Sequence, residues 1–175
     1  MSRRQPFPFD PIGEAVRNWR SAGWGEAATG MALVTSVMRA HQILLARVDA
    51  TLAPFGLTFS RFEVLMLLDF SRSGQLPLSR IGERLQVHPA SVTNAIDRLE
   101  AAGLVARKPH PTDGRTTLAA ITREGRTVVR RAASTLNREV FAAVGLDDSD
   151  SAGVVEKLSV LRRNAGDFAD DAART

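Results

Sequence analysis

The sequence contains no cysteine and no tyrosine, and it has no long uninterrupted run of apolar residues. Without cysteine, the chain can form no disulfide, use no thiol as a nucleophile or redox sensor, and hold no zinc through sulfur. No apolar run approaches the roughly 18 residues that a membrane-spanning helix needs. The N-terminal residues include two arginines but no apolar stretch behind them, unlike a secretory signal. We therefore expect a cytoplasmic protein with no membrane partner.

Motifs typical of enzymes are also absent from the sequence. It has no Gly-x-Ser-x-Gly nucleophile motif, no His-Glu-x-x-His zinc motif and no glycine-rich phosphate-binding loop. The histidines, His41, His88 and His110, are not spaced as metal ligands. We therefore expect no catalytic site, no metal site and no cofactor.

The charge is distributed unevenly along a chain of otherwise ordinary composition. Hydrophobic residues make up 44% and charged residues 24% of the 175 residues, as in a folded globular protein. Residues 76–131 carry 10 basic and 5 acidic side chains, whereas residues 132–175 carry 5 basic and 8 acidic ones. The basic middle indicates an anionic partner. A basic face that is merely solvated would have the same composition, so charge alone leaves both interpretations open.

The N-terminal part of the sequence predicts an arm followed by a long helix. Residues 1–25 contain three prolines, three glycines and both tryptophans, and only residues 11–20 read as a short helix. Apolar residues then recur at spacings of three and four over 26–53, which predicts about seven helical turns. An apolar stripe of this length must be buried, and a partner subunit is a natural candidate to cover it.

Residues 57–121 carry the order of elements of a winged helix-turn-helix. The predicted elements are a buried helix at 57–70, two short helices at 78–85 and 89–102 joined by a tight turn, and two strands at 104–108 and 115–121. An Asp-Gly turn between the strands indicates a β-hairpin, the wing. Thr122 is expected to cap a helix that runs to about Val144, and a final helix is expected to reach about Phe168. The fold class is therefore mainly α with a small β-hairpin wing.

The second short helix has a polar outer face that suits DNA reading. When its apolar residues point inward, the residues facing outward or on the flanks are Ala90, Ser91, Thr93, Asn94, Asp97 and Arg98. Asparagine pairs bidentately with adenine, serine and threonine contact bases or phosphates, and an alanine methyl can touch a thymine methyl. We expect Ala90, Ser91, Thr93, Asn94 and Arg98 to bind DNA, with this helix in the major groove and the wing in the adjacent minor groove.

The wing carries further candidate DNA contacts. Arg115 follows the hairpin tip, where a long cation suits the narrow, electronegative minor groove. Asp113 either holds the Arg115 side chain in place or simply forms the turn, and the sequence leaves both roles open. Lys108 and Arg107 are placed to meet phosphates, although either could be an ordinary exposed charge.

Five stretches together resemble the MarR family of bacterial transcription regulators. They are LSRIGERL at 78–85, HPASVTNAIDRLE at 88–100, AGLV at 102–105, TDGR at 112–115 and ITREGR at 121–126. The resemblance covers residues 26–168. It implies a homodimer joined by its first and last helices, a palindromic operator in double-stranded DNA, and a small aromatic or phenolic effector.

The resemblance also implies a division of the chain by role. Residues 1–25 would form the arm, 26–56 and 122–168 the dimerisation helices, 57–121 the DNA-binding domain, and 169–175 a C-terminal tail. The expected function is a homodimeric repressor that an effector releases from a pseudo-palindromic operator. Two alternatives remain, namely a winged-helix module that contacts proteins without DNA specificity, and a DNA-binding regulator without a ligand.

The tryptophan-bearing arm is similar to that of the urate-responsive branch of the family. In that branch, the effector site consists of a tryptophan, an acid in the second helix, and two arginines. One arginine lies in the recognition helix, the helix that reads DNA and corresponds to residues 89–102 here, and the other lies in the first wing strand. Trp19, Glu63 and Arg107 stand at corresponding places, whereas Ala95 replaces the recognition-helix arginine. The resemblance therefore implies a ligand site at Trp19, Glu63 and Arg107, for an aromatic ligand that is less anionic than urate or more weakly bound.

Overall fold

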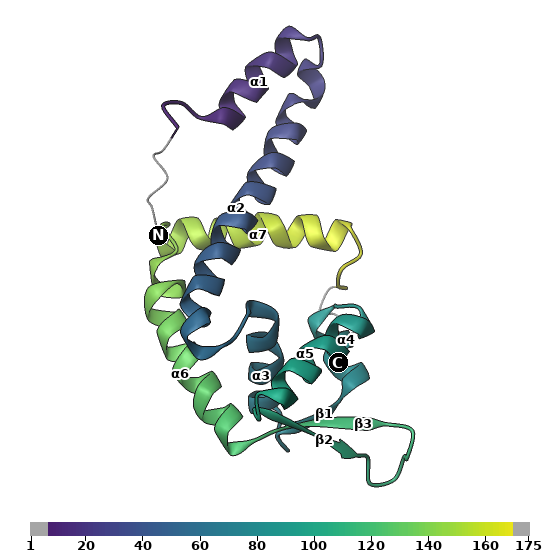
Figure 1. The fold of residues 1–175 in the computed structure, drawn as a ribbon. Coiled ribbons are helices and arrows are strands. Elements are labelled where there is room, and N and C mark those ends of the chain that lie inside the picture. Colours follow the sequence, from purple (N-terminus) through teal and green to yellow (C-terminus); the bar gives the residue numbers. More distant parts are fainter. Residues whose placement is uncertain (1–6, 170–175) are drawn as a thin grey trace. The chain divides into compact units, whose positions relative to one another are not determined.

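The computed structural model describes residues 7–169, which are mainly helical and include one small sheet (Figure 1). The expected first residues of the arm and nearly all of the expected tail lie outside the described residues. The chain divides into two compact units, Met1–Leu136 and Asn137–Thr175.

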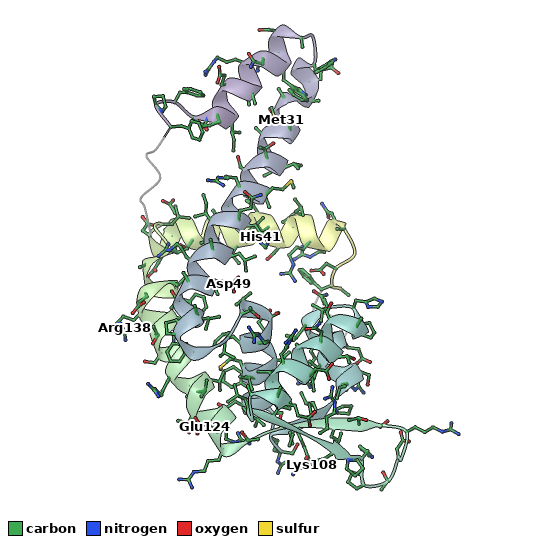
Figure 2. All side chains as sticks on the ribbon, in the orientation of Figure 1. Met31, His41, Asp49, Lys108, Glu124 and Arg138 are labelled. Atoms are coloured by element: carbon green, nitrogen blue, oxygen red, sulfur yellow. The ribbon has the colours of Figure 1, made fainter. Side chains whose placement is uncertain are left out.

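The N-terminal part of the first unit is a helical hairpin. The short helix α1, Pro11–Ser21, begins at Asp10, whose carboxylate accepts hydrogen bonds from the amides of Ile12 and Gly13 at 3.0 and 3.1 Å. A 3-10 turn at Gly25–Ala27 leads into the long helix α2, Ala28–Leu52. Figure 1 shows α1 folded back beside the N-terminal part of α2, and Figure 2 marks His41 and Asp49 further along α2. Both predicted helices are confirmed.

A helix-turn-helix occupies the middle of this unit. Helix α3 spans Phe59–Phe70, α4 spans Leu78–Leu85 and α5 spans Pro89–Ala101. Their fully buried side chains form the core, among them Leu65, Leu68, Ile81, Ile96 and Leu99. Val92, Ile96 and Leu99, which the 3.6-residue period places on the inner side of α5, are buried. The predicted burial of the helix at 57–70 is wrong at its end, where Phe70 is 78% exposed. The imidazole Nδ1 of His88 accepts a hydrogen bond from the amide of Ala90 at 3.2 Å and caps α5.

The sheet corrects the prediction of two strands. Within the described residues it has three strands in the order β1-β3-β2, all antiparallel, with β1 at Gln75–Pro77, β2 at Val105–Pro109 and β3 at Thr117–Ile121. Strand β1 is too short to show an alternating pattern, and it ends in a proline, which sheets tolerate at an edge. Its pairing with β3 joins residues more than forty positions apart in the sequence. Only tertiary structure could reveal such a strand.

The helix after the sheet is shorter than predicted. Helix α6 spans Arg123–Glu139, and its amide at Gly125 donates to Thr122 Oγ1 at 2.9 Å, which confirms the predicted cap. The expected continuation to Val144 is wrong, because Val140 leaves the helical conformation (φ −122°) and a 3-10 turn follows at Phe141–Ala143. No glycine or proline stands at this break to announce it in the sequence.

The second unit contains the last helix. Helix α7 spans Asp148–Asn164 and is capped by Asp147, whose carboxylate accepts from the amide of Asp150 at 2.8 Å. It ends before the expected Phe168, at a turn where Gly166 adopts a positive φ of 75°. A glycine at such a position commonly ends a helix, and the prediction overlooked it.

Among residues 7–169, no single helix is long and apolar enough to cross a membrane. The pair Gly25–Phe55 and Phe59–Phe70 reaches that length and composition only jointly, across a bend of 68°.

Candidate nucleic-acid interface

The outer face of α5 presents the predicted DNA-reading side chains. Ala90, Ser91, Thr93, Asn94 and Arg98 are all exposed, whereas the inward side of the helix is buried. The Thr93 hydroxyl donates to the carbonyl of Pro89 at 3.2 Å. Asn94 and Arg98 lie one turn apart on the same side of the helix. The arrangement leaves an amide and a guanidinium free to meet the edges of base pairs and a neighbouring phosphate.

A groove beside α5 contains polar residues that the sequence analysis missed. Its volume is about 710 Å³, and its lining includes Thr58, Ser60 and Arg61 from the start of α3 together with Asn94 and Arg98 from α5. Arg61 Nε donates to Thr58 Oγ1 at 3.2 Å, which holds its guanidinium near the groove. Two cations and several hydroxyls suit an anion such as a phosphate.

The sequence does not single out Ser60 and Arg61, because the apolar residues of the stretch 57–70 predict a helix buried on nearly all sides. The polar sequence Thr58-Phe59-Ser60-Arg61 at its start was the available signal. In the structure this first turn reaches the surface, and Ser60 is exposed beside the recognition helix.

The wing resolves the two roles left open for Asp113. Its carboxylate accepts from the Arg115 amide at 3.0 Å and from the Thr116 hydroxyl at 2.7 Å. These hydrogen bonds, the one from Thr116 above all, hold the pKa of the Asp113 carboxyl below its ordinary value. Asp113 thus forms the turn, and the Arg115 side chain is exposed at the tip. Lys108, labelled in Figure 2, lies on β2 and is exposed.

Arg107 ties the wing to the recognition helix. Its amide donates to Glu100 Oε1 at 2.9 Å, and its guanidinium pairs with the other Glu100 oxygen and with Asp97. The hydrogen bond from the Arg107 amide is the main cause that lowers the pKa of the Glu100 carboxyl. The hydrogen bond from the Arg107 guanidinium to Asp97 is the main cause that raises the pKa of Arg107. The sequence predicted that Arg107 contacts phosphate or effector, but here its charge is already met by two carboxylates.

The other two residues of the predicted ligand site, Trp19 and Glu63, have surroundings of their own. Trp19 packs edge-on against Trp24, with ring centroids 5.2 Å apart, and both line a pocket of about 680 Å³ in the arm together with Glu26. Glu63 lies half-buried on α3, where burial raises the pKa of its carboxyl. Within residues 7–169, no hydrogen bond, ion pair or ring contact joins Trp19, Glu63 and Arg107.

Comparison with known proteins identifies the same architecture elsewhere. A family model described as MarR family matches residues 57–117. Sco5413, a MarR family transcriptional regulator from Streptomyces coelicolor, is 51% identical, with a TM-score of 0.74 over 81% of this chain and 99% of that one. Sco3205 from the same organism, solved in complex with DNA, is 23% identical over 75% of this chain and 84% of its own, with a TM-score of 0.67, and shares the fold.

A curated relative is matched over a shorter stretch. The HTH-type transcriptional regulator MhqR of Bacillus subtilis is 36% identical over 87 residues, which are 50% of this chain and 59% of that relative. The likeness to Sco5413, by contrast, extends over nearly all of that protein. The chain therefore belongs to the MarR family, whose members are transcriptional regulators rather than enzymes.

Proposed function

We propose that the chain binds a pseudo-palindromic operator in double-stranded DNA as a homodimer and represses transcription by occluding the promoter. The observation that carries this proposal is the exposed polar face of α5 beside a wing with a cation at its tip. Helix α5 enters the major groove, Arg115 enters the adjacent minor groove, and Ser60 and Arg61 meet the phosphate backbone. Such a protein works in the compartment that holds the genome, which accords with the expected cytoplasmic location.

The homodimer is supported by the uncovered apolar stripe of α2. Leu33, Val34, Val37 and Met38 recur at helical spacing and are 40–61% exposed in one copy. A second copy related by a two-fold axis covers the same stripe on both chains. Two recognition helices then read half-sites whose centres lie about one turn of DNA, roughly 10 base pairs, apart.

Substitutions at two positions test the proposed reading geometry. Asn94→Ala is expected to relax the sequence preference, at a cost of about 1–3 kcal/mol if the amide binds a base bidentately. Arg115→Ala is expected to weaken binding with less effect on major-groove preference, because its contact lies in the minor groove. The measurement is selection of bound DNA from a random library, followed by titration of the selected operator at several salt concentrations.

Lys157→Ala provides the matched control, because it removes a highly exposed charge from α7 in the second unit. It is expected to leave affinity and the salt slope unchanged. If Asn94→Ala and Arg115→Ala also bind as the wild type does, the geometry is wrong. If the wild type binds all sequences equally, or binds no DNA, the winged domain has another use, such as contacting proteins.

We also propose that a small aromatic or phenolic effector binds the dimer at a site that includes Trp19, Glu63 and Arg107. The tryptophan pair of the arm, in which Trp24 is exposed and Trp19 half-buried, offers a ring surface. Glu63 offers a half-buried carboxyl to a ligand N–H or O–H group. An anionic ligand would have to compete with Asp97 and Glu100 for Arg107. This competition favours a ligand that is less anionic than urate.

Intrinsic fluorescence makes the effector proposal testable, since both tryptophans lie in the arm and the chain has no tyrosine. In a panel of phenolic acids and urate, an effector is expected to quench emission and to lower operator affinity about tenfold, a coupling of about 1.4 kcal/mol. Trp19→Ala is expected to bind the operator normally and to lose this response. If the Trp19→Ala variant is still released from DNA by the same compound, Trp19 merely anchors the arm and the site is wrongly assigned.

A further inference from the structure

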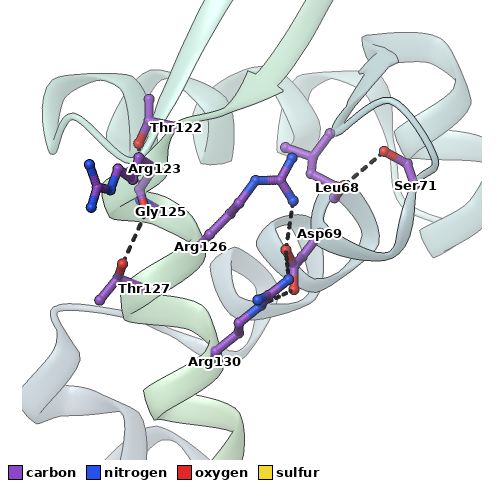
Figure 3. Close-up of polar contacts among 9 residues, drawn as sticks. All are labelled: Leu68, Asp69, Ser71, Thr122, Arg123, Gly125, Arg126, Thr127 and Arg130. Carbon is purple, nitrogen blue, oxygen red and sulfur yellow. Dashed lines mark hydrogen bonds and ion pairs between the residues drawn. The ribbon is translucent and has the colours of Figure 1, made fainter.

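One buried carboxylate fastens α6 to the winged domain. Asp69 stands in the last turn of α3, and only 6% of its side chain is exposed. It accepts hydrogen bonds from Arg126 Nη1 at 2.8 Å, from Arg130 Nε at 3.0 Å and from Arg130 Nη2 at 3.2 Å. Figure 3 shows the two arginines reaching from successive turns of α6 to this carboxylate. We call Asp69, Arg126 and Arg130 the α6 bracket.

The surroundings of Arg126 restrict the bracket further. Its guanidinium lies against the backbone of Gly74, where an added Cβ would stand 2.0 Å from Arg126 Nη2. Gly74 has a φ of +68°, and its carbonyl accepts from the Ile121 amide at 2.9 Å. The loop before β1, which is hydrogen-bonded to the end of β3, thus packs against the Arg126 guanidinium. The first two turns of α6 are held from two sides, by their covalent link to β3 and by Asp69.

Opposite charges hold the three side chains of the α6 bracket together. The hydrogen bond from Arg130 is the largest cause that holds the pKa of Asp69 below its ordinary value, and Arg126 adds to it. The carboxylate is therefore charged near neutral pH. The carboxylate is buried, whereas 36% of the Arg126 side chain and 68% of the Arg130 side chain remain exposed. Water therefore screens these ion pairs in part, and their net contribution to stability is small. The strict geometry of the hydrogen bonds, however, fixes the orientation of the elements that they join.

We propose that the α6 bracket sets the direction in which α6 leaves the winged domain, and through it the separation of the two recognition helices in the dimer. This inference rests on the proposed function. Asp69 is a positioning residue, since it belongs neither to the outer face of α5 nor to the wing tip. Helix α6 follows the winged domain directly and is itself the first part of the stretch 122–168 that is expected to dimerise.

The length of α6 explains why its direction matters. A helix of 17 residues is about 25 Å long. A tilt of about 10° at its start displaces its far end by roughly 4 Å, which exceeds the rise of about 3.4 Å per base pair. A loosened bracket would therefore change the half-site spacing that the dimer can match by about one base pair.

The test is Asp69→Asn, measured on operators whose half-site centres lie 9, 10, 11 or 12 base pairs apart. The wild type is expected to prefer one spacing at least tenfold over the others. In the variant this preference is expected to fall below threefold, while affinity for a single isolated half-site stays within twofold of the wild type. A thermal melt followed by circular dichroism verifies that the variant is folded.

Two variants on α6 complete the experiment. Arg130→Gln removes two of the three hydrogen bonds to Asp69 but leaves Arg126, and it is expected to broaden the spacing preference even if Asp69→Asn does not fold. Arg131→Gln removes the same charge from an exposed neighbouring position and is expected to keep the wild-type preference. A uniform loss of affinity at all spacings, or an unchanged profile, overturns the inference. Failure of the wild type to bind any operator would overturn the proposed function instead.

Discussion

The double variant Val37→Asp/Met38→Asp is expected to be monomeric at micromolar concentration and to bind operator DNA at least 100-fold more weakly than the wild type. Both side chains lie on the uncovered apolar stripe of α2, exposed by 40% and 61%. In the proposed dimer, the stripe would bury two unpaired carboxylates on each chain, which is strongly unfavourable. Once the subunits separate, each winged domain binds its half-site alone and loses the roughly 10²- to 10⁴-fold gain of linked binding.

Analytical ultracentrifugation and titration of a fluorescent operator measure the two parts of this result. Ser36→Asp is the matched control, because it adds a carboxylate at an exposed position on α2 away from the stripe. It should remain dimeric and bind as the wild type does. If the double variant is still a dimer, the two copies associate through another surface and the role assigned to residues 26–56 is wrong.

Replacing Gly125 by alanine is expected to destabilise the folded protein by about 1–3 kcal/mol, the usual cost of overpacking a tight site. Gly125 is buried in the first turn of α6, where an added Cβ would stand 2.1 Å from the carbonyl oxygen of Leu104 and 2.9 Å from Ile121 Cγ1. The Leu104 carbonyl already accepts from the amide of Thr122 at 3.0 Å. The methyl group therefore has to push α6 away from the start of the wing, which strains the helix cap.

A thermal melt detects this loss as a drop in Tm of several degrees, at about 2–4 °C per kcal/mol for a chain of this size. Gly153→Ala on α7 serves as the comparison, since an added Cβ there meets nothing within 4 Å. Alanine is favoured over glycine inside a helix by about 0.5–1 kcal/mol, so this variant should melt at the same or a higher temperature. If the two variants have the same Tm, the close approach of Gly125 to Leu104 does not contribute to the free energy of unfolding.

Local sequence signals predicted much of the framework of the fold. The spacing of Val92, Ile96 and Leu99 identified the buried side of α5, and hence its polar outer face. Thr122 caps its helix as expected, because a cap depends on residues only two or three positions away. The break at Val140 was missed, since no nearby glycine or proline marks it. The DNA contacts of the outer face, and the roles of Trp19 and Glu63, stay predictions.

The sequence by itself thus determined the order of the elements, the inner and outer faces of α5 and the family resemblance, because these depend on short-range periodicity and motifs. Only the tertiary structure decided which distant groups meet. Strand β1 exists through its pairing with β3, and Arg107 is engaged by carboxylates ten and seven residues earlier. Arg61 lines one groove together with residues of α5. The contacts of Asp69 with Arg126 and Arg130 span 57 and 61 positions. Such pairings depend on how the whole chain packs, and no local pattern of residue types encodes them.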